Sequence, residues 1–409
     1  MSDLQTKIKN DNLCIIPWVH LHTWPNGNVY PCCITPIENT VGNLNENTLT
    51  EIYNSDEMKK LRLQMLNNER PESCQRCYVQ EDCGAYSFRK SANRDFNAHT
   101  DLIYATNEDG SVDNPKLTYW DFRFSNVCNF KCRSCGPQLS TGWYNDSKKI
   151  SEIETGRKFL PDNVPGEITF DLWEQIQPYF NDVETIYFAG GEPLIMEEHY
   201  RILKKLDEIG KHDVSIRYNT NFSEMRYKDL YVLDHWKKFS NITVGASLDG
   251  MGEQGELIRS GFSWDQCVDN RKKMMDKCPH VDFYVNCTVS VQNAFHCIDF
   301  HKKLVDMGLI WGLDKFHVNP VMEPPYLSLQ ILPPDMKKTL TELYTEHAEM
   351  LESEGCHSVA NDFHSLVTYM NSENKQKLID TFLVKMSTLD IIRGEKFFRV
   401  FPELEVLRG

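Results

Sequence analysis

The sequence lacks long hydrophobic runs and an excess of positive charge. None of its 409 residues lies in a stretch that approaches the ~18 apolar residues needed to cross a membrane. The first twelve residues, MSDLQTKIKNDN, lack the apolar core of a signal peptide. Fifty-nine acidic residues against forty-four basic ones give a net charge of −15, which opposes binding to nucleic-acid phosphates and anionic lipids. These absences predict a cytoplasmic protein with no nucleic-acid partner and no membrane partner.

The sequence also gives no sign of a disulfide framework, although it contains fourteen cysteines. Without a secretion signal, a reducing cytosol keeps thiols free for metal binding or catalysis. Nine cysteines fall in two groups, one within the first hundred residues and one at 128–135. The rest are scattered singly and are interpreted as small buried hydrophobic residues: Cys267, Cys278, Cys287, Cys297 and Cys356.

The chain is long enough for two or three domains, because a typical domain takes roughly 100–200 residues. A hydrophobic fraction of 41% and a charged fraction of 25% are typical of a folded protein. Patterning predicts a cysteine-rich α+β domain, a polar linker, an α/β domain and a helical extension. Their expected bounds are 1–95, 96–115, 116–330 and 331–409.

The amino-terminal segment has the pattern of a small metal-stapled domain. CIIPWVHLHTWPNGNVYPCCIT at 14–35 alternates apolar and polar residues around Asn26 and Gly27, which predicts a β-hairpin. TLTEIYNSDEMKKLRLQML at 48–66 has apolar residues three and four apart, which predicts one helix. This helix leads to CQRCYVQEDC at 74–83.

Short β-rich runs then alternate with amphipathic helical stretches. This alternation predicts βαβ units, right-handed crossovers and a parallel sheet. Six such runs suggest a partial (β/α)6 TIM-like barrel. The predicted strands are 117–124, 183–190, 214–221, 242–249, 281–291 and 314–322.

The first of these strands leads directly into CNFKCRSC, which holds Cys128, Cys132 and Cys135. Functional groups collect at the carboxyl ends of parallel strands, so this loop has the position of an active site. A structural zinc site usually has four ligands, and the nearby loop offers no fourth. A [4Fe–4S] cube held by three thiolates would instead leave one iron open.

AGGEP at 189–193 ends the second predicted strand. Gly190 and Gly191 would let the backbone approach a ligand closely, and Glu192 would accept a hydrogen bond from an ammonium group, worth roughly 1.5–3 kcal/mol. CxxxCxxC after one strand and GGE after the next resemble the radical SAM enzymes over about residues 115–325. The resemblance implies that the three cysteines bind a [4Fe–4S] cluster. It further implies that GGE meets the amino group of S-adenosylmethionine, and that this molecule is cleaved to a 5′-deoxyadenosyl radical.

Other positions resemble cofactor contacts of this family. Ser247 in SLDG and Arg259 in LIRSG look like the element that holds the methionine carboxylate and the ribose, and a guanidinium suits a carboxylate because it bonds at two points. Arg259 would otherwise begin a solvated helix. Ser134 replaces the aromatic residue often found before the third cysteine. Weaker candidates for ribose and adenine contacts are Asn219, Thr220, Asn221 and Val321.

The amino-terminal cysteines resemble the auxiliary-cluster domains called SPASM or, when shortened, twitch. In that family such domains usually follow the core, whereas here the pattern precedes it. The resemblance implies a second [4Fe–4S] cluster, with Cys33 left over and Cys83 as an alternative ligand. Zinc remains the competing interpretation of two cysteine pairs. The implied cluster ligands are Cys14, Cys32, Cys74 and Cys77.

The resulting prediction is an enzyme that takes an electron from reduced ferredoxin or flavodoxin and abstracts hydrogen from a substrate. The resemblance allows a peptide or protein substrate, or a small carbohydrate-like alcohol. The alternative is a non-catalytic, zinc-stapled binding protein. Side chains near the expected strand ends that could contact substrate are Tyr119, Asp121, Arg123 and Asp249.

Overall fold

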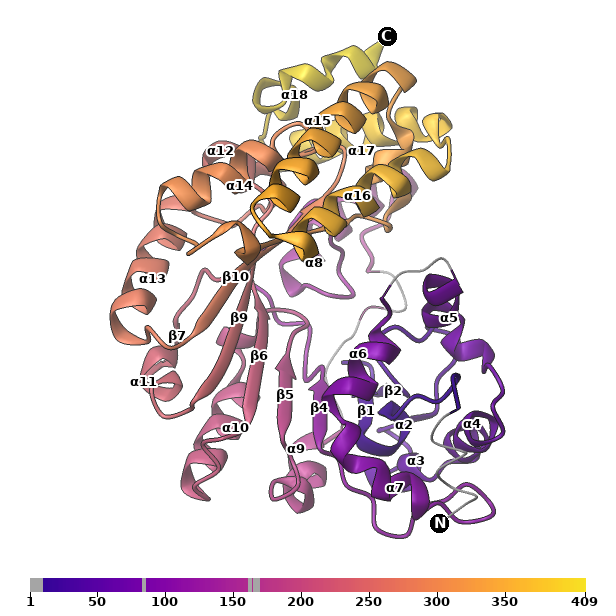
Figure 1. The fold of residues 1–409 in the computed structure, drawn as a ribbon. Helices are drawn as coiled ribbons and strands as arrows, with labels where there is room; N and C mark the ends of the chain where they lie inside the picture. The colour runs from indigo at the N-terminus through magenta and orange to yellow at the C-terminus, as the bar shows by residue number, and fades with distance from the viewer. Residues whose placement is uncertain (1–9, 83–85, 161–163, 165–169) are drawn as a thin grey trace. The chain divides into compact units, whose positions relative to one another are not determined.

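The computed structural model describes residues 10–82, 86–160, 164 and 170–409 (Figure 1). The chain divides into two compact units. Unit 1 comprises Met1–Ser125, Pro165–Gly190 and Arg201–Arg217, and unit 2 comprises Asn126–Val164, Gly191–Tyr200 and Tyr218–Gly409. Both units mix helices with parallel strands, and the described strands of neither unit close into a barrel.

Unit 1 has the strand order β5-β4-β1-β2-β3. Strand β1 pairs antiparallel with β2 and parallel with β4, which pairs parallel with β5. The strands are β1 (His20–Thr23), β2 (Asn28–Tyr30), β3 (Gly42–Asn43), β4 (Tyr119–Phe122) and β5 (Thr185–Phe188). The helices are α2 (Ile16–Val19), α3 (Leu49–Tyr53), α4 (Asp56–Leu66), α5 (Gln75–Asp82), α6 (Phe88–Asp95), α7 (Thr100–Tyr104) and α9 (Leu172–Ile176).

The parallel pairing of β1 with β4 joins the amino-terminal hairpin to the first strand of the predicted α/β pattern. In this register His20 lies opposite Tyr119, and His22 lies opposite Asp121. Because side chains alternate between the two faces of a strand, the two histidines share a face. The pairing therefore brings residues 99 positions apart into one polar group.

Two local predictions for unit 1 need correction. The predicted hairpin strand begins only at His20, because the preceding residues form α2. The predicted single helix at 48–66 is two helices, α3 and α4. The Ser55 hydroxyl accepts a hydrogen bond from the Met58 amide and caps a new helix, as serine does when it competes with a continuing helix.

A fully buried arginine holds much of unit 1 together. The Arg62 guanidinium donates to the carbonyl oxygens of Pro17, Tyr53 and Gly110 at 3.0, 2.7 and 3.2 Å. It also stacks 4.2 Å from the centre of the Tyr53 ring. These bonds satisfy a buried charge with backbone dipoles, and they tie α4 to α2 and to the segment 96–115.

Unit 2 contains the remaining predicted strands. Strand β9 (Asn241–Ser247) pairs parallel with β10 (Asp282–Val289), and β10 pairs parallel with β11 (Phe316–Pro320). Strand β6 (Ser215–Thr220) and helix α10 (Glu197–Glu208) each contain a division between the units. All six strands predicted for the α/β segment are therefore present, within one or two residues at every end.

Helices cover the rest of unit 2, and its last part is helical as predicted. Helices α15 and α16 pack against each other (Figure 1). Helix α16 also packs on β11. In the described part of the chain, every helix is too short or too polar to cross a membrane. The helices are α8 (Tyr144–Thr155), α11 (Val232–Trp236), α12 (Gly252–Ile258), α13 (Trp264–Lys277), α14 (Cys297–Asp306), α15 (Pro334–Ser353), α16 (His357–Ser372), α17 (Ile379–Arg393) and α18 (Phe397–Val400), and a short antiparallel pair is formed by β7 (Arg226–Tyr227) and β8 (Leu230–Tyr231).

Candidate cluster and cofactor site

The three-cysteine loop follows β4 and is anchored at several points within unit 2. The amides of Lys131 and Arg133 donate to the carbonyls of Ser260 and Ile258 at 2.9 and 2.7 Å. The fully buried Arg133 guanidinium also lies 2.7 Å from Asp390 and 2.6 Å from Glu395. The loop is thereby fixed beside Arg259 and against the end of α17.

The three thiols lie in a protected and mutually interacting group. Burial raises the pKa of Cys128 to about 12, and burial together with Cys132 and Cys128 raises the pKa of Cys135 to about 12. Burial also raises the pKa of Cys132, and the Arg259 guanidinium partly offsets this effect. Three thiolates here would need a bound cation or a metal cluster to balance their charge.

The loop sulfur atoms are not all as close together as the ligands of a single zinc ion. Zinc binds sulfur at about 2.3 Å, so tetrahedral ligands lie about 3.8 Å apart. Over the described ranges of the chain, no three cysteine sulfurs lie within 4.8 Å of one another. A cubane takes its thiolate ligands at different corners, so the wider spacing is compatible with a [4Fe–4S] cluster.

The GGEP turn approaches the cysteine loop without room for side chains. Gly191 has φ +56°, and a Cβ there would lie 2.4 Å from the Val127 carbonyl oxygen. The amide of the next residue, Glu192, donates to that same oxygen at 2.8 Å. Gly190, at φ +81°, belongs to unit 1, where a Cβ would lie 2.8 Å from Cδ of Arg123. Both glycines are therefore required by geometry.

Glu192 is completely buried and already accepts three hydrogen bonds. They come from the Thr220 hydroxyl at 2.7 Å, the Asn221 amide at 2.6 Å and the Leu194 amide at 3.0 Å. Burial raises the pKa of Glu192 to about 7, although these hydrogen bonds oppose the rise. An ionised carboxylate has about four acceptor positions, so capacity for one further donor remains.

The end of β6 connects Glu192 to the cysteine loop. The Asn221 side chain donates to the Asn129 side chain at 2.9 Å and lies 3.9 Å from the Cys128 sulfur. The sequence predicted ribose contacts for Thr220 and Asn221 but not this connection. Asn219 Oδ1 is buried and has no hydrogen-bond partner among the residues described.

Arg259 is held by a carboxylate that sequence reasoning did not pair with it. Its Nε lies 2.8 Å from Asp249 Oδ2, and both side chains are nearly buried. Asp249 is itself fixed by the Thr288 amide at 2.8 Å. Arg259 Nη1 lies 4.0 Å from the Cys132 sulfur. The predicted carboxylate-binding group thus stands beside the second cysteine, with its orientation set by Asp249.

The two remaining predicted cofactor contacts lie at strand ends in unit 2. Ser247 is the last residue of β9, and Val321 follows β11. The Val321 amide donates to the Val289 carbonyl at 2.8 Å. Their positions agree with the expected carboxyl edge, but no contact distinguishes a cofactor role for either.

The four amino-terminal cysteines gather within unit 1. Burial raises the pKa of Cys14 and Cys32, and it raises the pKa of Cys74 to about 12. Cys77 is also buried, and each of the other three interacts electrostatically with it. Such a set of four buried or half-buried thiols fits a fully ligated metal cluster.

The structure describes Cys33 but not Cys83, the two amino-terminal cysteines outside the predicted ligand set. Cys32 and Cys33 lie in the bend and turn that follow β2. Cys33 is exposed, and its electrostatic partners include Asp121 and Arg123, which are outside the four-cysteine group. Cys83 lies outside the described residues.

Residues 14–78 match the family model SPASM, described as an iron-sulfur cluster-binding domain. The amino-terminal resemblance is thereby confirmed, and this chain carries an iron–sulfur cluster-binding domain there. None of the curated protein sequences matches the chain.

Solved structures similar to this chain include native anSMEcpe with bound AdoMet. The identity is 18% and the TM-score 0.39, and the match covers 57% of this chain and 60% of that one. The same protein with AdoMet and Cp18Cys peptide gives 21% identity and a TM-score of 0.37, covering 56% and 59%. TYW1 with a lysine-pyruvate adduct gives 15% and 0.29, covering 55% and 70%. The chain spans less than two thirds of the length of the first two.

Proposed function

We propose that this chain is a radical SAM enzyme with one catalytic and one auxiliary [4Fe–4S] cluster. The observation that carries the proposal is the grouping, within unit 2, of Cys128, Cys132 and Cys135 with Glu192 and Arg259. Three sulfur donors stand there with a carboxylate and a guanidinium. That combination suits binding of an amino acid that completes the coordination of an iron without a protein ligand.

The protein groups have separable tasks in binding S-adenosylmethionine. Glu192 accepts a hydrogen bond from the ammonium group, while Gly191 lets the backbone come close. Arg259 donates to the methionine carboxylate, and Asp249 keeps its guanidinium oriented. When bound, a reduced cluster with an open iron supplies the electron that cleaves S-adenosylmethionine to methionine and a 5′-deoxyadenosyl radical.

The other predicted contacts complete the nucleotide site in this proposal. Gly190, Asn219, Ser247 and Val321 contact the amino-acid, ribose and adenine parts of S-adenosylmethionine. We propose that the parallel strands correspond to the partial (β/α)6 barrel expected for such an enzyme. The domain bounds inferred from sequence, 1–95, 116–330 and 331–409, describe its auxiliary-cluster, core and helical parts.

Electron supply and substrate follow from the same proposal. The catalytic cluster needs a low potential, near the roughly −400 mV of plant-type ferredoxins, so reduced ferredoxin or flavodoxin is the expected donor. The substrate is a peptide or a small alcohol. The four-cysteine group, with all four thiols bound, then serves electron transfer or substrate placement.

Anaerobic purification followed by a cleavage assay tests this proposal. Two clusters predict roughly eight iron and eight sulfide per chain, and reduced protein should convert S-adenosylmethionine to 5′-deoxyadenosine. Stoichiometric zinc without iron would instead support the zinc-stapled alternative. Cleavage that survives Cys128→Ala, Cys132→Ala and Cys135→Ala would contradict the site assignment.

A further inference from the structure

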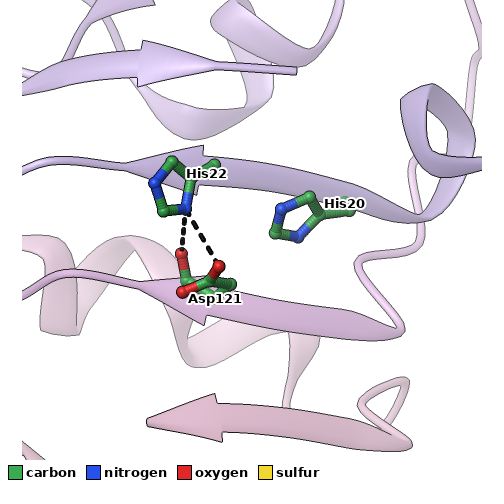
Figure 2. Close-up of side chains that lie close together, drawn as sticks. All are labelled: His20, His22 and Asp121. Carbon is green, nitrogen blue, oxygen red and sulfur yellow. Dashed lines mark hydrogen bonds and ion pairs between the residues drawn. The ribbon is translucent and has the colours of Figure 1, made fainter. Parts of the chain in front are cut away.

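His20, His22 and Asp121 form a buried polar group on neighbouring strands of unit 1 (Figure 2). One ligand atom from each residue lies within 4.8 Å of the other two. Two histidines and a carboxylate are also a common set of metal ligands. The hydrogen bonds of each side chain decide between a metal ion and another ligand.

His22 has no nitrogen left for a metal. The Trp24 indole N–H can only donate, and it lies 3.0 Å from His22 Nε2, so Nε2 is the accepting nitrogen. The proton is then on Nδ1, which lies 3.0 Å from the Asp121 carbonyl oxygen and 3.2 Å from its carboxylate. Figure 2 shows both contacts. A metal ion would have to break this chain of hydrogen bonds.

Asp121 already has a cationic partner. Arg123 Nε lies 2.9 Å from Asp121 Oδ1. Burial alone would raise the pKa of Asp121, but Arg123 and His22 together lower it to about 2. A second positive charge, whether a metal or an ammonium, would be repelled by the guanidinium in this poorly solvated place. A neutral ligand fits the charge balance better.

His20 has an acceptor nitrogen without a hydrogen-bond partner among the described residues. Its Nδ1 lies 3.0 Å from the Tyr119 carbonyl oxygen, which can only accept, so Nδ1 carries the proton and Nε2 is a lone-pair acceptor. His20 is 1% exposed, and among the described residues Nε2 has no hydrogen-bond partner. Burial lowers the pKa of His20 to about 4, so the ring stays neutral near pH 7. Leaving such an acceptor unpaired is unfavourable.

Within unit 1, Arg123 extends this polar group toward Gly190 and toward Cys33. Arg123 Nε and Nη2 face Asp121, while Nη1 is not used by that carboxylate. The Arg123 side chain lies against Gly190 of the GGEP turn. Cys33, next in sequence to the proposed cluster ligand Cys32, interacts electrostatically with both Asp121 and Arg123. The group therefore offers an acceptor, His20 Nε2, and a donor, Arg123 Nη1, within unit 1.

We propose that His20 and Arg123 bind a neutral hydroxyl group of the substrate. His20 Nε2 accepts the hydroxyl hydrogen, and Arg123 donates to the hydroxyl oxygen. A hydroxyl matches this pair because it donates and accepts at one atom, whereas an amide N–H only donates. His22 and Asp121 position the arginine and do not touch the ligand. This inference rests on the proposed function for the identity of the ligand as substrate.

Nitrogen NMR of the full-length, cluster-loaded protein with ¹⁵N-labelled histidine tests the proposal. The probes are N-acetylserinamide and N-acetylalaninamide, which differ only by the hydroxyl. We expect the serine probe to move the His20 Nε2 resonance and to bind about tenfold more tightly than the alanine probe. Equal effects from both probes would overturn the proposal. So would no shift with either, which means that the site holds only water.

A matched pair of variants tests whether His20 Nε2 is the nitrogen that binds the hydroxyl. His20→Phe keeps an aromatic ring on Tyr119 but removes the acceptor, and it should abolish the difference between the probes. His212→Phe, at a half-exposed histidine of the same unit, should leave the difference intact. If His20→Phe folds poorly, the comparison of the two probes in the unsubstituted protein still decides.

Two further readouts separate the possible failures. One equivalent of Zn²⁺ should leave the His20 resonance in place, and a stoichiometric shift would overturn the proposal in favour of a metal site. Formation of 5′-deoxyadenosine is measured in the same sample without either probe. Its absence would count against the proposed function, whereas the histidine shift reports the hydroxyl site independently.

Discussion

The two cysteine groups differ in their number of thiols and in the charged residues beside them. The group at Cys14, Cys32, Cys74 and Cys77 has four buried or half-buried thiols, enough to saturate a cluster. The loop group has one thiol fewer, and its neighbours include the carboxylate of Glu192 and the guanidinium of Arg259. A site that is one ligand short thus keeps charged groups nearby that suit an amino acid. The difference supports the proposal that the loop group binds a reactant.

The largest expected effects come from removing one cysteine from one group at a time. Cys132→Ala should abolish 5′-deoxyadenosine formation and lower bound iron from roughly eight to roughly four per chain. Cys77→Ala should lose a similar amount of iron yet keep cleavage of S-adenosylmethionine. Iron analysis and product chromatography measure both results. If Cys77→Ala lost cleavage while retaining the loop cluster, the division of labour would be wrong.

Gly191→Ala should have the next largest effect on S-adenosylmethionine binding, because it alters only the space beside the three-cysteine loop. A Cβ would collide with the Val127 carbonyl oxygen at 2.4 Å, and the positive φ adds roughly 1–2 kcal/mol of strain. We expect at least about a tenfold loss in S-adenosylmethionine affinity, measured by calorimetry. The control is Gly156→Ala, which has φ +73° and nothing within 4 Å. Equal losses in both variants would show that strain, and not the close approach, is responsible.

Arg259→Lys tests the carboxylate contact while keeping the charge. A lysine cannot reproduce two-point bonding, so S-adenosylmethionine should bind about 10–100-fold more weakly, the equivalent of one charge-assisted hydrogen bond. Calorimetry at fixed salt concentration gives the affinity. Arg89→Lys makes the same exchange beside the four-cysteine group and should leave this affinity unchanged. An unaffected Arg259→Lys variant would remove this residue from the site.

The smallest expected effect is a pH dependence that arises from Glu192. Because burial raises its pKa to about 7, the carboxylate that would bind an ammonium group is formed only as the pH rises. Affinity for S-adenosylmethionine should therefore increase about tenfold between about pH 5.5 and 7, below the range in which an α-amino group deprotonates. Glu192→Gln should flatten the profile. A wild-type profile that is already flat, or that falls, would contradict the prediction.

The raised pKa of Glu192 affects folding stability in the opposite direction, because its contribution to stability falls as the pH rises. A carboxyl whose pKa is higher in the folded state binds more protons there, so its contribution to stability is complete below the unfolded value of about 4.3. That contribution is lost as the pH rises through about 7. Denaturant unfolding of wild type and Glu192→Gln at several pH values measures it.

Periodicity and spacing predicted the features that depend on nearby residues. The six strands of the α/β segment are present, and the loop carrying Cys128 follows β4 as expected. Each depends on side-chain alternation or on a short motif, both of which are local. The break between α3 and α4 was missed, although Ser55 before an acidic turn is a helix-start signal.

Long-range pairings were beyond sequence reasoning. The sequence contains HLH at 20–22 and an aspartate at 121, but nothing in either segment specifies that β1 pairs with β4. The pairing of Asp249 with Arg259 depends on where α12 ends, and element boundaries are the least predictable features. Both pairings involve buried charge, whose partners are set by tertiary packing and not by propensity.

The most direct test of the central claim is electron paramagnetic resonance of the reduced protein, recorded with and without S-adenosylmethionine. The account predicts two cluster signals, of which one changes when S-adenosylmethionine is added and is absent from Cys132→Ala, while the other stays the same and is absent from Cys77→Ala. If both signals ignored S-adenosylmethionine, or if the responding signal belonged to the four-cysteine group, the claim that the loop cluster is the open one would be contradicted.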